Sequence, residues 1–272
     1  MMRAWRIILI TLGSVLLLYL VLVGALFLFQ RSLLYPAPKT IPARPAGFDD
    51  VRIETSGLKL RAFYRAAKPG LPTLLFFHGN GSDIEASAYA TRLLVAQGYG
   101  ALLPEYRGYG GNPGAPDEQG LYRDGEASMA WLATKAVTTD RIVVIGNSLG
   151  SGVATELAAR HRIGGLVLVS GFASLVEIAG DQYPFVPTNL LVLDRYDNVT
   201  KIRSVTCPIL LLQGTADTLV SVAQSRALAR AKRSATLELI PGVGHELAFR
   251  DVSQARILAW LRSGAIKAGM SH

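Results

Sequence analysis

One serine of this chain stands where the backbone could hold it as a nucleophile. The segment Gly146–Gly150 reads Gly-Asn-Ser-Leu-Gly, follows the apolar run Ile142–Ile145 and precedes an alanine-rich stretch that favours a helix. A G-x-S-x-G pattern between a strand and a helix is typical of a sharp turn that presents the serine hydroxyl at the tip of a sheet. The glycines are needed because side chains there would clash with the adjoining strand and helix. Ser148 is therefore a candidate nucleophile, and its chemistry would be that of a serine hydrolase.

A serine hydroxyl is a weak nucleophile at neutral pH, so a base must take its proton and a carboxylate must orient that base. The sequence holds four histidines: His272 is terminal, His161 lies in a polar helix end, and His78 ends a strand upstream of the serine. His245 instead follows the last predicted strand on a glycine-rich loop. Catalytic groups collect at that edge of a parallel sheet. We therefore predict that His245 is the base.

The carboxylate that orients the base is predicted to be Asp217. In the chain order serine, acid, histidine, the acid falls between Ser148 and His245. Asp217 directly follows the apolar run Ile209–Leu212, which places it at the tip of a strand. A turn or helix-cap role is the alternative interpretation of Asp217. Asp194 is the second choice for the acid.

A tetrahedral intermediate also needs donors for its negative oxygen. Backbone N–H groups suit this purpose because they are fixed in space before the charge develops. One donor is predicted from Leu149, the residue after the serine. The other is predicted from the segment His78–Gly81, which follows the apolar strand Thr73–Phe77. Asn80 is the expected donor of that loop, and His78 would shape the loop without reacting.

These groups need a scaffold that brings distant segments to one place. A hairpin is predicted over Val51–Glu54 and Leu58–Tyr64, followed by apolar strands at Thr73–Phe77, Gly100–Leu103, Arg141–Ile145, Gly165–Val169, Pro208–Leu212 and Thr236–Ile240. Helices are predicted near residues 84–97, 119–135, 149–161, 221–232 and 251–263. Continuous apolar strands with helices between them indicate a parallel sheet buried on both faces. The predicted fold class is α/β, with about eight mostly parallel strands and helices on both faces.

The amino-terminal region is predicted to be a membrane anchor over residues 1–30. Ile7–Phe29 is a run of 23 uncharged residues, which as a helix spans roughly 34 Å and exceeds a bilayer core of about 30 Å. A cleaved signal peptide is the alternative, but its apolar region is normally shorter, about 7–15 residues. Arg3, Arg6 and the amino terminus precede the run, and Arg31, Lys39 and Arg44 follow it, so the charge is nearly balanced. Because the leading tail is short, we expect a signal anchor with the following domain outside the cytoplasm.

The rest of the chain is predicted to form one domain at the end of a linker. Residues 31–50 contain four prolines, which favour an extended linker. Residues 51–265 are the predicted hydrolase domain. Within it, residues 171–205 are irregular, because Pro184 and Pro187 prevent a continuous helix and Asn189–Leu193 is short and apolar, and the segment is long enough to be a functional loop. We predict that this insert is a small lid over the serine.

No cofactor, metal ion or nucleic acid is predicted to bind. The chain carries a formal net charge of +8, but its basic residues are scattered and form no nucleic-acid groove. Neither a G-x-G-x-x-G nor a P-loop pattern occurs, and Phe249 stands where an H-E-x-x-H zinc motif beginning at His245 would need its second histidine. Cys207 is the only cysteine, so an intramolecular disulfide is excluded.

The motifs taken together resemble one known superfamily. Their order and approximate spacing are similar to those of the α/β-hydrolase superfamily, in particular of its membrane-anchored serine hydrolase branch: His78–Asn80, Glu105–Gly110, Gly146–Gly150, Gly214–Asp217 and Gly244–His245. The segment Arg195–Asp197 is also similar to that group. The resemblance covers about residues 50–262 and the anchor. Relatives often carry Arg, His or Tyr before the serine, where this chain has Asn147.

The resemblance implies hydrolysis of acyl esters, thioesters or lysophospholipids through an acyl-enzyme. Two other hypotheses stay open: a serine peptidase of the same fold, and a catalytically silent binding or scaffold module. The presence of serine, acid and histidine together favours catalysis over a scaffold. The anchor and the apolar insert favour amphiphilic, lipid-like substrates. Acyl length, headgroup and oligomeric state do not follow from the sequence.

Overall fold

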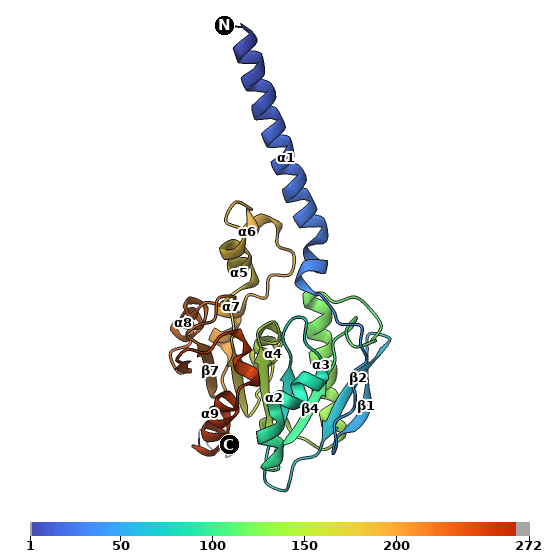
Figure 1. Ribbon diagram of the computed structural model, residues 1–272. Helices are drawn as coiled ribbons and strands as arrows, with labels where there is room; N and C mark the ends of the chain where they lie inside the picture. The colour runs from blue at the N-terminus through green and yellow to red at the C-terminus, as the bar shows by residue number, and fades with distance from the viewer. Residues whose placement is uncertain (1, 265–272) are drawn as a thin grey trace.

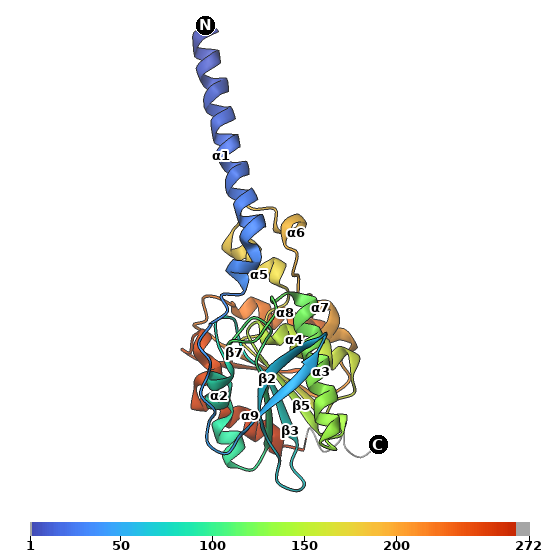
Figure 2. The same ribbon diagram turned by 90° about the vertical axis from the view of Figure 1, so that its right-hand side faces the viewer.

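The computed structural model describes residues 2–264, which form an α/β domain with a long helix projecting from it (Figures 1 and 2). The strands are β1 (Asp49–Thr55), β2 (Leu58–Arg65), β3 (Thr73–Phe77), β4 (Gly100–Pro104), β5 (Ile142–Asn147), β6 (Gly165–Val169), β7 (Ile209–Gly214) and β8 (Thr236–Ile240). The α-helices are α1 (Met2–Leu34), α2 (Ile84–Ala96), α3 (Glu118–Thr134), α4 (Gly150–Arg160), α5 (Leu175–Gln182), α6 (Thr188–Leu191), α7 (Asn198–Lys201), α8 (Val222–Ala231) and α9 (Asp251–Arg262). Short 3-10 turns are η1 (Thr139–Arg141), η2 (Ile202–Ser204) and η3 (His245–Phe249).

The strands form one sheet in the order β1-β2-β4-β3-β5-β6-β7-β8. β2 pairs antiparallel with both β1 and β4, and the pairs from β4 through β8 are parallel. The carboxyl ends of these parallel strands therefore meet at one edge, where ligands bind in open α/β sheets. The predicted α/β class, the eight strands and the mostly parallel pairing are confirmed, and each predicted helix is present within two residues of its expected limits.

Two hydrophobic cores cover the two faces of the sheet. Alternate residues of β3 divide between them: Leu75 and Phe77 join the core beneath α3, α4 and α8, while Leu74 and Phe76 join the core beneath α2 and α9. All five residues of β3 are buried. Apolar side chains on both faces explain why these central strands read as continuous apolar runs in the sequence.

Helix α1 leaves the domain and none of its residues is buried (Figure 1). Among the described residues it is the one helix long and apolar enough to cross a membrane, with a mean hydropathy of 2.7 over its most apolar window. The helix continues four residues past the expected limit at residue 30. The following segment, expected to be a linker, lies against the domain: Tyr35 and Phe48 are buried, and Gly110 N–H donates to the Pro38 carbonyl at 2.8 Å.

The insert predicted over residues 171–205 contains α5, α6 and α7. Both views show α5 and α6 beside the lower half of α1, above the carboxyl edge of the sheet (Figures 1 and 2). Prolines separate the two helices, since α5 ends at Gln182 and α6 begins at Thr188. The expected end of the domain at residue 265 lies outside the described residues.

Candidate active site

Ser148 occupies the turn between β5 and α4 in a left-handed conformation, with φ of +49°. Such a conformation is uncommon for a residue with a side chain and is stabilised here by its surroundings. A Cβ on Gly150 would overlap the Phe77 carbonyl oxygen, and a Cβ on Gly146 would lie 2.5 Å from the Gly150 carbonyl oxygen. The turn therefore requires glycine at both positions, which is the reason inferred from the sequence.

His245 and Asp217 lie beside Ser148. The His245 Nε2 atom is 3.0 Å from the Ser148 Oγ atom, and the His245 Nδ1 atom is 2.9 Å from the Asp217 Oδ2 atom. The Asp217 side chain has no exposed surface, whereas the His245 side chain is 31% exposed. The structure thus brings together the three residues predicted as nucleophile, base and acid, and hydrogen bonds link them in that order.

Four hydrogen bonds hold the Asp217 carboxylate. Its Oδ1 atom accepts from the Leu219 N–H at 3.0 Å and the Val220 N–H at 2.8 Å, and Oδ2 accepts from Gln213 Nε2 at 3.1 Å and from His245. Burial by itself raises the pKa of Asp217, but the His245 and backbone hydrogen bonds outweigh it, so the pKa lies below its ordinary value. Asp217 is therefore an ionised acceptor at neutral pH.

Gln213 is a supporting residue that the sequence reasoning missed. It is fully buried at the end of β7. Besides Asp217, its Nε2 atom donates to the Val220 carbonyl at 2.8 Å, and its Oε1 atom accepts from Ser225 Oγ at 2.7 Å. A polar residue in the last position but one of an otherwise apolar strand was the available signal.

The loop after β3 lies directly against the serine. A Cβ on Gly79 would sit 3.4 Å from the Ser148 Cβ atom, so the backbone here approaches the nucleophile closely. Among residues 2–264, neither the Asn80 N–H nor the Leu149 N–H donates a hydrogen bond. Both predicted donors thus have N–H groups without a protein partner among these residues, and their role at Ser148 stays a prediction.

His78 supports that loop and lies apart from the reacting groups. It is 1% exposed, with Nε2 2.8 Å from the Glu105 Oε1 atom and Nδ1 2.8 Å from the Gly79 carbonyl. Glu105 also accepts from the Ile84 N–H at 3.1 Å, and so joins the loop to the start of α2. The sequence reasoning named Glu105 only as the first residue of the Glu105–Gly110 motif and gave its side chain no function. Its position immediately after β4, the strand beside β3, was the signal.

The other candidate residues have partners elsewhere. Asp194, the second choice for the acid, accepts from Arg31 Nε at 3.0 Å and Nη2 at 3.2 Å, and from the Glu118 N–H. His161 caps the end of α4 beside Glu126, and His272 lies outside the described residues. Burial raises the pKa of the Cys207 thiol to about 12, so this cysteine is not a nucleophile.

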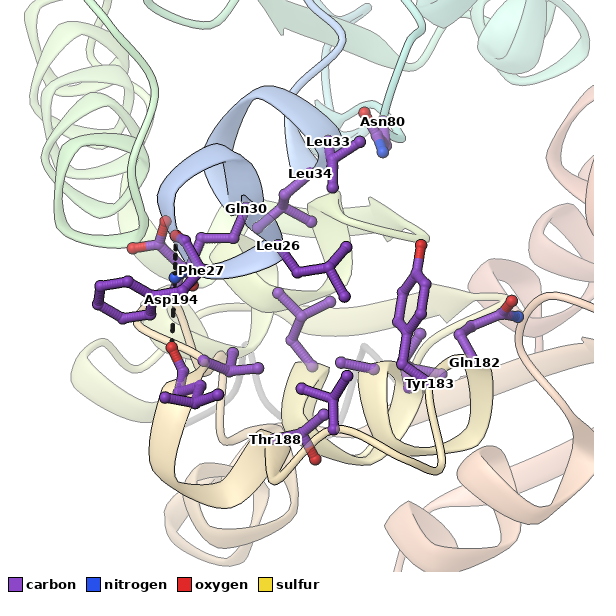
Figure 3. Close-up of a pocket in the computed structure, with 16 residues that line it drawn as sticks. Leu26, Phe27, Gln30, Leu33, Leu34, Asn80, Gln182, Tyr183, Thr188 and Asp194 are labelled. Atoms are coloured by element: carbon purple, nitrogen blue, oxygen red, sulfur yellow. Dashed lines mark hydrogen bonds between the residues drawn. The ribbon is translucent and has the colours of Figure 1, made fainter. Parts of the chain in front are cut away.

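Two cavities adjoin the carboxyl edge of the sheet. The cleft at Ser148 and His245 has a volume of about 510 Å³ and is also lined by Asn80, Asn147 and Phe249. A second, mainly apolar pocket of about 210 Å³ lies between α1 and the insert (Figure 3). Asn80 lines both of them, so the two cavities adjoin at the predicted oxyanion loop. Within the described residues, no cluster of three or more His, Cys, Asp or Glu could hold a metal ion.

The chain is similar to known proteins over most of its length. Residues 72–199 match the family described as the alpha/beta hydrolase fold. An uncharacterised protein of Mycobacterium tuberculosis strain H37Rv is 38% identical over 225 residues, which cover 79% of this chain and 80% of that protein. The human alpha/beta hydrolase domain-containing protein 17B is 30% identical over 188 residues, covering 67% of this chain and 63% of that protein.

Solved structures with the same fold include two hydrolases. An esterase of Pyrococcus furiosus has a TM-score of 0.68 at 21% identity, covering 86% of this chain and 97% of the esterase. A membrane phospholipase A, described as a bacterial virulence factor, has a TM-score of 0.60 at 17% identity and covers 100% of both chains. At these identities the likeness shows the fold alone. With the sequence relatives, the family match and the sheet topology in agreement, this chain belongs to the α/β-hydrolase superfamily.

Proposed function

We propose that this protein is a membrane-anchored serine hydrolase that cleaves carboxylic acyl esters or thioesters through an acyl-enzyme. The observation that carries the proposal is the pair of hydrogen bonds that links Ser148 to His245 and His245 to Asp217. The His245 Nε2 atom, 3.0 Å from the serine oxygen, is within reach for proton transfer. The other imidazole nitrogen faces an ionised carboxylate that fixes the tautomer and orientation.

In the first half of the reaction, the Ser148 oxygen attacks the acyl carbonyl carbon while His245 Nε2 takes the serine proton. The carbonyl oxygen becomes an oxyanion and accepts hydrogen bonds from the N–H groups of Asn80 and Leu149. The tetrahedral intermediate then expels the alcohol or thiol, which receives the proton from His245. Asp217 stabilises the imidazolium that exists between these two proton transfers.

In the second half, water takes the place of the leaving group. His245 removes a proton from the water as its oxygen attacks the Ser148 ester, and a second tetrahedral intermediate forms in the same oxyanion site. Collapse of this intermediate releases the carboxylic acid and returns the proton to Ser148. The cleft beside His245 gives the water access, because this imidazole is partly exposed.

The fold neighbours support ester chemistry, since an esterase and a membrane phospholipase A share this architecture. The apolar helix α1 supports attachment to a membrane. We infer that α1 spans the bilayer as an uncleaved anchor, and we propose that the hydrolase domain lies outside the cytoplasm. Protease added to intact cells would then release the domain, whereas protection of the domain would place it inside.

The reaction class is tested by comparing p-nitrophenyl acyl esters with amino-acid p-nitroanilides, using the full chain in detergent. We expect a higher kcat/KM for the esters, and we expect Ser148→Ala to lower their kcat/KM by several orders of magnitude with the fold intact. Faster turnover of the anilides would make the protein a peptidase. Absence of turnover of either substrate class would favour the binding module.

A further inference from the structure

The insert contacts α1 far inside the apolar run of that helix. The Tyr19 hydroxyl donates to the Phe185 carbonyl at 3.0 Å, and Tyr19 lies ten residues before the end of the run at Phe29. At about 1.5 Å per residue, this contact is roughly 15 Å from that end. If the insert stayed outside the bilayer, only Ile7–Leu18 would be left to cross it. Twelve residues give about 18 Å, which is too short for a hydrocarbon core of about 30 Å.

The composition of the insert agrees with a position inside the bilayer. Residues 182–193 carry no charged side chain, and charges begin immediately on either side, at Asp181 and Asp194. Four large apolar or aromatic side chains of this segment are exposed: Tyr183, Phe185, Leu190 and Leu193. Leu190 is 83% exposed. Exposed apolar side chains gathered beside an apolar helix mark a surface that contacts lipid.

Polar side chains of α1 pair with backbone groups of the insert. Gln30 Nε2 donates to the Leu191 carbonyl at 3.2 Å, and Gln30 Oε1 accepts from the Leu193 N–H at 2.9 Å. The Tyr19 hydroxyl likewise donates to the Phe185 carbonyl. Irregular backbone is tolerated at membrane depth only where such groups are satisfied inside the protein. The pairing therefore lowers the free-energy cost of placing this segment among lipid chains.

The apolar pocket lies between these two elements and adjoins the catalytic cleft. Leu26, Phe27 and Leu34 line it from α1, and Ile178 and Leu191 line it from the insert (Figure 3). Asn80 lines both this pocket and the cleft at Ser148. An acyl chain lying in the pocket would thus have its carbonyl group near the serine and the oxyanion donors.

We propose that the insert is embedded in the bilayer leaflet that surrounds the carboxyl-terminal half of α1. The pocket then receives one acyl chain of a bilayer amphiphile directly from that leaflet. This inference rests on the proposed hydrolase function and anchor, and it names the substrate class: lipids or acylated amphiphiles resident in the membrane. The anchor helix is then one wall of the acyl site as well as a tether.

The depth of the insert is tested without reference to catalysis. In the full chain carrying Cys207→Ala, bimane is attached to Leu190→Cys, to Leu16→Cys on α1, or to Ala66→Cys on the loop after β2. Each protein is placed in phosphatidylcholine vesicles that contain doxyl-labelled lipid. We expect strong quenching at positions 190 and 16 and little at the exposed position 66. Quenching at 16 but not at 190 would overturn the embedded insert, and no quenching at 16 would overturn the anchor as well.

The acyl pocket is tested with a matched pair of substitutions on one helix. Leu26 lines the pocket, whereas Leu28 is 76% exposed and does not. We expect Leu26→Trp to lower the ratio of kcat/KM for octanoyl over acetyl p-nitrophenyl ester by about tenfold, the effect of excluding about two methylenes. Leu28→Trp should leave this ratio unchanged. Equal ratios in both variants would overturn the pocket assignment, while lack of turnover by the unsubstituted chain would instead overturn the hydrolase function.

Discussion

The catalytic groups and the groups that line the apolar pocket are held in different ways. Ser148, Asp217 and His245 each follow a strand of one sheet, so the register of β5, β7 and β8 fixes their distances. The pocket instead lies between α1 and an insert about 150 residues away in the chain, which are joined by side-chain contacts such as Arg31 with Asp194. The catalytic groups are thus placed by strand pairing within one sheet, whereas the proposed acyl pocket depends on the junction between α1 and the insert, which side-chain contacts hold together. The two can be altered separately.

The largest difference in turnover is expected between the variants of two aspartates, Asp217 and Asp194. Asp217→Asn should lower kcat by roughly 10³–10⁴ on both acetyl and octanoyl esters, because the imidazole loses its oriented tautomer. Asp194→Asn should change acetyl ester turnover by less than about threefold, since Asp194 is bonded to Arg31 and to the Glu118 N–H and to none of the catalytic residues. Steady-state kinetics of the two purified variants measure this. A larger loss from Asp194→Asn would reverse the assignment of the acid.

A smaller loss of kcat/KM, confined to substrates with long acyl chains, is expected when the junction between α1 and the insert is weakened. Arg31→Met removes the ion pair to Asp194 and keeps an apolar stem on α1. We expect kcat/KM for the octanoyl ester in vesicles to fall about threefold, with the acetyl ester unchanged, because the pair joins α1 to the insert and touches none of the catalytic residues. Equal losses on both esters would mean that the junction positions the catalytic groups too.

The smallest effect is a pH dependence of stability. Because the pKa of Asp217 in the folded protein lies below its ordinary value of 3.8, its ionised form stabilises the fold above that pH. The stabilisation is lost as pH falls through the lowered pKa. We expect the difference in Tm between the unsubstituted chain and Asp217→Asn, in detergent, to be constant near neutral pH and to shrink below about pH 4. A difference that grows in acid would contradict the lowered pKa.

The strands that carry the catalytic groups could be predicted from the sequence, whereas the junction between α1 and the insert could not. The strands and the site residues follow local rules: an apolar run, a glycine turn, and a polar residue at the strand tip. Such rules gave Ser148, Asp217 and His245 their positions because parallel strands end at one edge. The supporting residues Gln213 and Glu105 were missed, since their roles depend on which neighbouring strand they face.

The junction could not be predicted for a different physical reason. The prolines of residues 31–50 indicated an extended spacer, but Tyr35 is buried and its hydroxyl lies 2.9 Å from that of Tyr196. Whether such a segment hangs free or lies on the domain depends on contacts between residues far apart in the chain. The local amino-acid composition does not indicate these contacts. The pocket between α1 and the insert was hidden for the same reason.

The most direct measurement identifies the residue that a fluorophosphonate modifies in the full chain. Tryptic peptides of the treated protein are mapped by mass spectrometry, with Ser148→Ala and His245→Ala as comparisons. We predict the phosphonyl group on Ser148, none on the alanine variant at 148, and strongly slowed labelling without His245. Undiminished labelling of Ser148→Ala, or a phosphonyl group on another residue of the unsubstituted chain, would contradict the assignment of Ser148 as the nucleophile.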